Sequence, residues 1–345
     1  MKLLHCAFAL LLLQAATTSA QDTASKIDSK VFFTEEGLPE ATLTTDLNVL
    51  MIDRNKNVEK KGIFSIRMPD STSYTGDIAM TNRGKFRLEN CFVPPIKVKF
   101  KNAESSRLST LKNLKLVNGC NTGSYNDQLL IKEYLVYKIY NLLSDMSFRV
   151  RLINLKLHDS RGKKKDINMH SFFIEDIDEL AKRNHCRKME ETARVNTEST
   201  DRAHMTFVSI FQYMIGNTDW SVPVGHNIKL IRSKKDSLAK PFAVAYDFDY
   251  SGLVNANYAV PDEHLETTSV RERVYRGFPR NLEELKQAIV PFKEQKEKIY
   301  AVISSCDLLT SGNKADMKGY LDSFYNTIET DRDLKRHFID QARTE

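Results

Sequence analysis

Residues 216–250 read GNTDWSVPVGHNIKLIRSKKDSLAKPFAVAYDFDY, and this is the most informative stretch of the sequence. It contains three short polar motifs, at 216–220, 226–227 and 246–250, each next to a helix-like or strand-like run. A loop residue next to a regular element is held rigidly over any cleft that lies there. Phosphoryl transfer requires a carboxylate for the acceptor hydroxyl and oxygen ligands for Mg²⁺ or Mn²⁺. The order Asp, Asn, Asp in this stretch supplies these groups.

Upstream, residues 42–100 show short apolar alternations separated by turns, which predict an antiparallel sheet. Strands are expected near 47–51, 64–68, 78–80 and 96–101. In the last of these the apolar residues point one way and Lys97, Lys99 and Lys101 the other. The lysine face is either a solvated strand edge or part of a site.

The first strong helix is expected at 126–143, opened by Ser124 with Asp127 in capping-box spacing. Glu133 lies near the edge of its apolar stripe. Further strands are expected at 149–157 and 167–174, a hairpin at 227–231 and 242–246, and helices at 205–215, from Asn281 and from Lys314. This order predicts an α+β chain with a sheet-rich first half, a mainly helical second half and a cleft between them.

The composition excludes some classes of protein. The net charge of +6 comes from interspersed cations and anions rather than from a basic face, so no nucleic-acid partner is expected. Residues 1–20, MKLLHCAFALLLLQAATTSA, have the pattern of a cleavable signal peptide, and their apolar run is too short to span a bilayer. We therefore expect an exported protein, periplasmic or extracellular, that is soluble after cleavage and has no membrane anchor.

Four cysteines remain after residue 20: Cys91, Cys120, Cys186 and Cys306. Four cysteines can pair in three ways, and their spacing does not choose among them. One or two disulfides are expected.

The order of several motifs resembles the spore-coat-protein-H (CotH) kinase-like family, atypical members of the protein-kinase-like superfamily. The motifs are Arg83-Gly84, Pro95 to Phe100, Tyr125 to Asp127, Phe173 to Asp178 with Lys182-Arg183, Asn217 to Trp220, His226-Asn227 and Tyr246 to Asp249. The resemblance implies a two-lobed atypical protein-kinase-like fold that binds ATP with Mg²⁺ or Mn²⁺. It divides the chain into a signal peptide (1–20), an N-terminal extension (21–41), a sheet-rich N-lobe (42–175) and a helical C-lobe (176–345).

The resemblance also implies roles for residues of the central stretch. Asp219 would be the catalytic aspartate that orients the acceptor hydroxyl. Asn227 and Asp247 would bind the metal, with Asp249 as an alternative ligand. His226 is expected to make a structural hydrogen bond or to bind metal.

Nucleotide binding would fall to residues of the first half. Lys97, or Lys99 in its place, would hold the phosphates, and Glu133 would be the ion-pair partner of that lysine. An exposed position for Glu133 is the alternative. Glu175 and Ile177 would receive the base.

Three arginines follow the Asp247 loop, where the acceptor is expected. Arg271, Arg273 and Arg276 either bind an acidic acceptor or a phosphate, or form an exposed charged segment.

Departures from the family pattern exclude a classical kinase. Eight positions separate Asp219 from Asn227 where ordinary protein kinases have five, and no glycine-rich phosphate loop is found. The sequence therefore predicts an exported CotH-like kinase that transfers the ATP γ-phosphate to an unknown protein or small-molecule hydroxyl acceptor. A catalytically inactive kinase-like binding protein and a two-carboxylate glycosidase are the alternatives.

Overall fold

The computed structural model describes residues 27–84, 86–100 and 108–343. The predicted signal peptide lies outside the described residues. Within those ranges, no helix combines the length and the apolar character that a bilayer span requires.

The first half of the chain forms a closed seven-stranded barrel with the strand order β1-β2-β3-β4-β5-β7-β6. Its strands are β1 Glu40–Thr45, β2 Lys60–Arg67, β3 Ser73–Asn82, β4 Ile96–Lys99, β5 Asn113–Asn118, β6 Val150–Asp159 and β7 Ile167–Ile174. Neighbouring strands are antiparallel except β1 and β6, which run parallel and close the barrel. The prediction of a purely antiparallel sheet is therefore wrong for one pair of strands. The closing pair, β1 and β6, is parallel and joins distant positions such as Glu40 and Asn154.

One predicted strand is wrong, because Leu47–Ile52 forms helix α2. The side chain of Asp46 accepts the N–H of Val49 at 3.1 Å and caps the helix. The side chains of Leu50 and Met51 then pack in the barrel core. The alternating apolar residues are equally consistent with one helical turn.

The long helix α4, Ser124–Leu143, contacts both β7 of the barrel and α8 of the second half. Its N-cap is Gly123, which makes no side-chain hydrogen bond, so the predicted capping box at Ser124 and Asp127 is wrong. The Asp127 carboxylate instead accepts the N–H of His170 at 3.2 Å. The start of α4 is thus fastened to the barrel wall.

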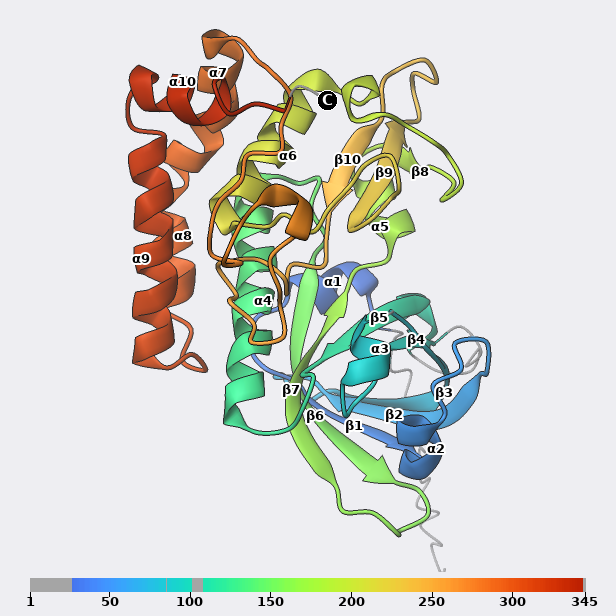
Figure 1. Ribbon diagram of the computed structural model, residues 1–345. Helices are drawn as coiled ribbons and strands as arrows, with labels where there is room; N and C mark the ends of the chain where they lie inside the picture. Colours follow the sequence, from blue (N-terminus) through green and yellow to red (C-terminus); the bar gives the residue numbers. More distant parts are fainter. Residues whose placement is uncertain (1–26, 85, 101–107, 344–345) are drawn as a thin grey trace, which may run out of the picture.

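The second half is mainly helical with one small sheet of order β10-β9-β8. Its elements are α5 Ile177–Arg183, β8 Cys186–Lys188, α6 Arg202–Ile215, β9 Ile228–Ser233, β10 Phe242–Ala245, α7 Leu282–Glu294, α8 Lys296–Ser304, α9 Ser311–Thr327 and α10 Asp331–Phe338. Short helices α1 Ser29–Thr34 and α3 Phe86–Asn90 flank the barrel. Figure 1 shows the barrel at the bottom, the small sheet at the upper right and α7–α10 at the upper left. The predicted α+β class is confirmed.

Two separate hydrophobic clusters form the core. One fills the barrel, and the other is shared by α4 and the second half. Strands β5, β6 and β7 contribute to both, because their outward residues Val117, Leu152 and Phe172 belong to the second cluster. The two halves are therefore held together by buried apolar surface.

One disulfide forms, between Cys91 and Cys120. It joins the segment that follows α3 to the segment that precedes α4. Cys186 and Cys306 are unpaired.

Candidate functional site

A cleft of about 300 Å³ lies between the barrel and the small sheet. Its lining residues are Lys97, Asn113, Lys115, Phe148, Glu175, Asp176, Ile177, Asp178, Lys188, Met189, Glu190, Glu191, Lys229 and Leu230. A hollow of about 520 Å³ on the barrel wall is larger but is lined mainly by hydroxyl and amide side chains. The smaller cleft is the candidate site because the predicted nucleotide-binding residues Lys97, Glu175 and Ile177 all line it.

Two lysines face the cleft from neighbouring strands of the barrel. Lys97 on β4 and Lys115 on β5 are direct cross-strand partners, so their side chains leave the same face of the sheet. Like charges placed directly opposite each other destabilise a sheet. Neither lysine has a salt bridge to another described residue. An anion bound in the cleft would remove the repulsion.

Lys115 is enclosed more tightly than Lys97. Its Nζ lies 3.9 Å from the centre of the Tyr246 ring. Burial and then the positive charge of Arg83 lower the pKa of Lys115 to about 7. Lys229 approaches the same ring at 5.8 Å but is neutralised by Glu191 at 2.5 Å.

Sequence reasoning named Lys97 or Lys99 and missed Lys115. Lys99 pairs with Glu59 at 2.5 Å and does not line the cleft. Lys115 lies on β5, the strand directly before α4, and α4 carries Glu133. A strand lysine followed by a helix glutamate is the pattern expected of a kinase-like fold, so this order could have identified Lys115 from the sequence.

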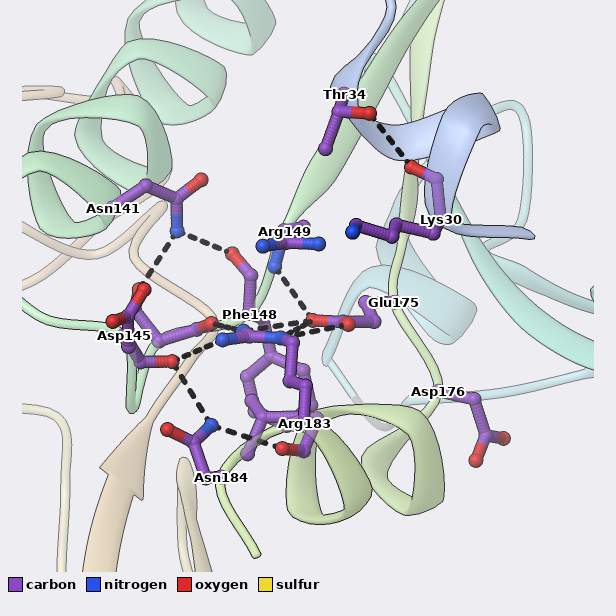
Figure 2. Close-up of polar contacts among 12 residues, drawn as sticks. Lys30, Thr34, Asn141, Asp145, Phe148, Arg149, Glu175, Asp176, Arg183 and Asn184 are labelled. Carbon is purple, nitrogen blue, oxygen red and sulfur yellow. Dashed lines mark hydrogen bonds and ion pairs between the residues drawn. The ribbon is translucent and has the colours of Figure 1, made fainter. Parts of the chain in front are cut away.

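The chain between the two halves borders the cleft at 175–178. Figure 2 shows the Glu175 carboxylate turned toward the backbone of Arg149 and the guanidinium of Arg183. It accepts the N–H of Arg149 at 3.1 Å and Nε–H of Arg183 at 3.0 Å. The Glu175 side chain is thus used to fix this connection, while Ile177 lines the cleft.

The loop that carries Asp219 begins where α6 ends. Gly216 caps that helix in the left-handed region (φ 65°), and a Cβ there would collide with the Tyr320 hydroxyl. Asn217 donates to Gln212 Oε1 at 3.0 Å and accepts the N–H of Asp219 at 3.0 Å. The rigid helix end therefore positions Asp219.

Asp219 and Asn227 are brought together despite their eight-position spacing. Ser221 and His226 form a β-bridge, which folds the intervening residues into a tight hairpin. The Asp219 carboxylate accepts from Asn227 Nδ2 at 2.9 Å and contacts His226 Nε2 at 2.7 Å. The hydrogen bond to Asp219 raises the pKa of His226. The predicted hydrogen-bonding role of His226 is confirmed.

Asp247 lies beside this loop at the end of β10. The N–H of Tyr246 donates to the carbonyl of Asn227 at 3.0 Å, which joins the two segments. Asp247 has a positive φ of 66°, and its N–H donates to the hydroxyl of Tyr137 on α4 at 2.8 Å. Asn227 also has a positive φ, of 51°. Such backbone conformations in non-glycine residues concentrate at functional sites.

Asp249 is separated from Asp247 and points into the protein. It is buried, accepts the hydroxyl of Tyr258 at 3.0 Å and lies 3.9 Å from Arg87. Burial and then the charge of Asp247 raise the pKa of Asp249 to about 6. Its carboxylate is therefore used in an internal network rather than in the cleft.

Glu133 belongs to the same buried network. Only 2% of its surface is exposed, so the alternative of an exposed helix carboxylate is wrong. Burial and then the charge of Asp249 raise the pKa of Glu133, which Arg87 and Arg83 oppose. Its Oε1 lacks a hydrogen-bond partner among the described residues. The predicted ion pair of Glu133 with Lys97 or Lys99 is not formed among those residues, and Lys99 pairs with Glu59 instead.

Two of the three arginines after the Asp247 loop are engaged with helices of the second half. Arg271 pairs with Asp316 at 3.0 Å. Arg273 donates to the carbonyls of Met214 at 3.2 Å and Tyr320 at 2.6 Å. Their guanidinium groups tie the segment to α6 and α9.

Arg276 binds the loop that carries Asp219. It donates to the carbonyls of Thr218 and Trp220, the latter at 3.1 Å, and lies over the Trp220 ring at 5.5 Å. The Trp220 side chain is buried. The role of these arginines in acceptor binding stays a prediction.

No group of three or more acidic, histidine or cysteine side chains forms a ready metal cage in the described part of the chain. Magnesium commonly uses only one or two carboxylates together with substrate phosphates and water. Asn227 and Asp247 fit that mode, since they offer one amide oxygen and one carboxylate from neighbouring segments. The donor set suits a metal that arrives with a polyphosphate.

No family model and no curated protein matches this chain. Among solved structures it is similar to the proinflammatory kinase CtkA of Helicobacter pylori. The TM-score is 0.39 at 9% sequence identity, over 80% of this chain and 92% of that one. A score of this size does not establish a shared fold.

Proposed function

We propose that this protein is an atypical, two-lobed kinase-like enzyme that transfers the γ-phosphate of ATP to a hydroxyl acceptor. The observation that carries the proposal is the cleft with two lysines on its barrel wall, Lys97 and Lys115, neither of which forms a salt bridge within the described residues. On the other side, Tyr246 packs on Lys115 and leads directly into Asp247. Asn227 and Asp247 do not line the cleft, but the charge of Asp247 acts on the Lys115 amine, so the proposed metal ligands lie within electrostatic range of the proposed phosphate-binding cations.

Each group has a separate task in this scheme. Lys97 and Lys115 hold the phosphates, and Ile177 borders the base. Asn227 and Asp247 would hold Mg²⁺ or Mn²⁺, which supplies charge neutralisation on the phosphates when bound.

Asp219 accepts the proton of the acceptor hydroxyl. The acceptor oxygen then forms a bond to the γ-phosphorus while the bond to the ADP oxygen breaks. His226 and Asn227 fix the orientation of the Asp219 carboxylate through their bonds of 2.7 and 2.9 Å.

We place this enzyme outside the cytoplasm. The signal-like residues 1–20 and the Cys91–Cys120 disulfide support this, because disulfides persist in oxidising compartments. Since ATP is scarce there, activity would depend on a secretory compartment supplied with nucleotide or on tight binding.

A second candidate is a nucleotide-binding protein that does not catalyse. Both carboxylate oxygens of Asp219 already accept bonds from residues of its own loop. A carboxylate held in this way has fewer lone pairs for an acceptor hydroxyl.

Thermal unfolding of the purified protein with ATP and Mn²⁺ tests the proposal. We expect a higher melting temperature with ATP and Mn²⁺ together than with either alone, and loss of this effect in Asp247→Ala. Asp236→Ala, in the exposed turn before β10, is the matched control. No stabilisation of the wild-type protein would refute nucleotide binding.

Transfer of labelled γ-phosphate, followed by mass mapping, separates the two candidates. Stabilisation without any transfer would favour the non-catalytic binding protein.

A further inference from the structure

Helix α4 carries two buried tyrosines less than one turn apart, Tyr137 and Tyr140. Both rings pack against Phe248, with centroid distances of 4.7 Å and 6.1 Å. Their hydroxyls differ. That of Tyr137 accepts the N–H of Asp247 at 2.8 Å, whereas that of Tyr140, near Ala245, makes no hydrogen bond of standard geometry within the described chain.

The hydrogen bond to the Tyr137 hydroxyl pairs a backbone N–H, that of Asp247, which lies outside the regular strand pairing. Strand β10 ends at Ala245, so the N–H of Asp247 lies beyond the β-ladder. Its positive φ of 66° is disfavoured for a residue with a Cβ and persists only where surrounding contacts enforce it. The packing of Phe248 between α4 and α6 fixes the next residue, and the Tyr137 hydroxyl fixes the N–H of Asp247 itself.

We propose that Tyr137 is a positioning residue whose hydroxyl holds Asp247 in the left-handed conformation that presents its carboxylate for metal binding. The inference rests on the proposed function. Without the hydroxyl, Asp247 can relax to an ordinary backbone conformation, which re-aims its side chain. Nucleotide would still meet the lysines, but the metal would bind more weakly.

The two tyrosines provide a matched pair of variants. Tyr137→Phe and Tyr140→Phe each remove one buried hydroxyl from the same helix, and within the described chain only the first breaks a hydrogen bond of standard geometry. The probe is a fluorescent ATP analogue titrated with Mn²⁺. Y137F should need about three- to tenfold more Mn²⁺ for half-maximal binding, the ratio that corresponds to one neutral hydrogen bond. Y140F should match the wild type.

Amide hydrogen exchange in the nucleotide-free protein is the second measurement. Exchange at Asp247 should accelerate in Y137F while exchange in the centre of α6 stays unchanged, which distinguishes a local release from general destabilisation. If Y137F does not fold, the wild type still decides the matter, because an Asp247 N–H bonded to Tyr137 must be protected.

The outcomes separate the two proposals. A wild-type protein that shows no Mn²⁺-dependent binding refutes the proposed function and, with it, the role of Tyr137. Wild-type binding with equal Mn²⁺ requirements in Y137F and Y140F refutes the Tyr137 inference alone, as does an unprotected Asp247 amide.

Discussion

Substitution of Lys115 by methionine should make the nucleotide-free protein more stable and abolish its response to nucleotide. Methionine keeps an unbranched side chain as far as Cε but removes the amine that faces Lys97 across the strands. The lysine therefore costs stability in the free protein and becomes favourable only when an anion is bound.

The size of the effect follows from the surroundings of the amine. The pKa of Lys115 is lowered from its usual 10.5 to about 7, chiefly by burial. A pKa shift of this size corresponds to roughly 5 kcal/mol of free energy that disfavours the charged amine in the folded state. Because Lys115 keeps partial contact with solvent in the cleft, we expect a smaller gain, about 1–2 kcal/mol at pH 7.

The pH dependence has a definite sign. Since the folded-state pKa of Lys115 is lowered, the unfolded chain binds more protons between about pH 7 and pH 10. Wild-type stability therefore gains a contribution as the pH rises through this window. Lys115→Met lacks that contribution, so its advantage shrinks toward pH 10.

Urea unfolding at pH 7 and pH 9, with and without ATP and Mn²⁺, measures both effects. Lys99→Met is the control, because Lys99 is paired with Glu59 outside the cleft and its loss should leave nucleotide stabilisation intact. A Lys115→Met protein that is no more stable than wild type, or that nucleotide stabilises equally well, would show the reasoning to be wrong.

Two further predictions concern the loop and the disulfide. Asp219→Asn should keep Mn²⁺-dependent nucleotide binding but slow phosphoryl transfer by about 10²- to 10⁴-fold, the usual contribution of a general base; equal transfer rates would remove Asp219 from the mechanism. The double variant Cys91→Ser/Cys120→Ser should lose about 2–4 kcal/mol in urea unfolding, since the disulfide closes a loop across 29 positions. It should also loosen α3 and so weaken the Arg87–Asp249 contact; a variant as stable as the wild type would contradict this.

The sequence predicted those elements whose signals are local. The end of α6 at Gly216 and the start of α7 at Asn281 are both confirmed, and a capping box with Glu284 holds the latter. The strand at Lys97 is also confirmed, although it ends at Lys99. Each depends on residues within a few positions of one another.

Other features depend on contacts that no local pattern reveals. The alternation at 47–51 fits a strand or a helical turn, and the cap from Asp46 decides for the helix. Glu133 is buried, and the charges that act on it from Arg87 and Arg83 come from segments 46 (133 − 87) and 50 (133 − 83) positions earlier in the chain. The choice of Cys91 with Cys120 among three pairings likewise requires the three-dimensional fold.

The parallel pairing of β1 with β6 has a consequence for the order of folding. Thr45 pairs with Asp159, so the barrel cannot close until more than a hundred further residues have been synthesised. Pairings of such long sequence separation are slow to form because loop closure must come first. A slow first half keeps the emerging chain unfolded for longer. That delay would suit the proposed export, because an exported polypeptide crosses a membrane through a narrow channel before it takes its final shape.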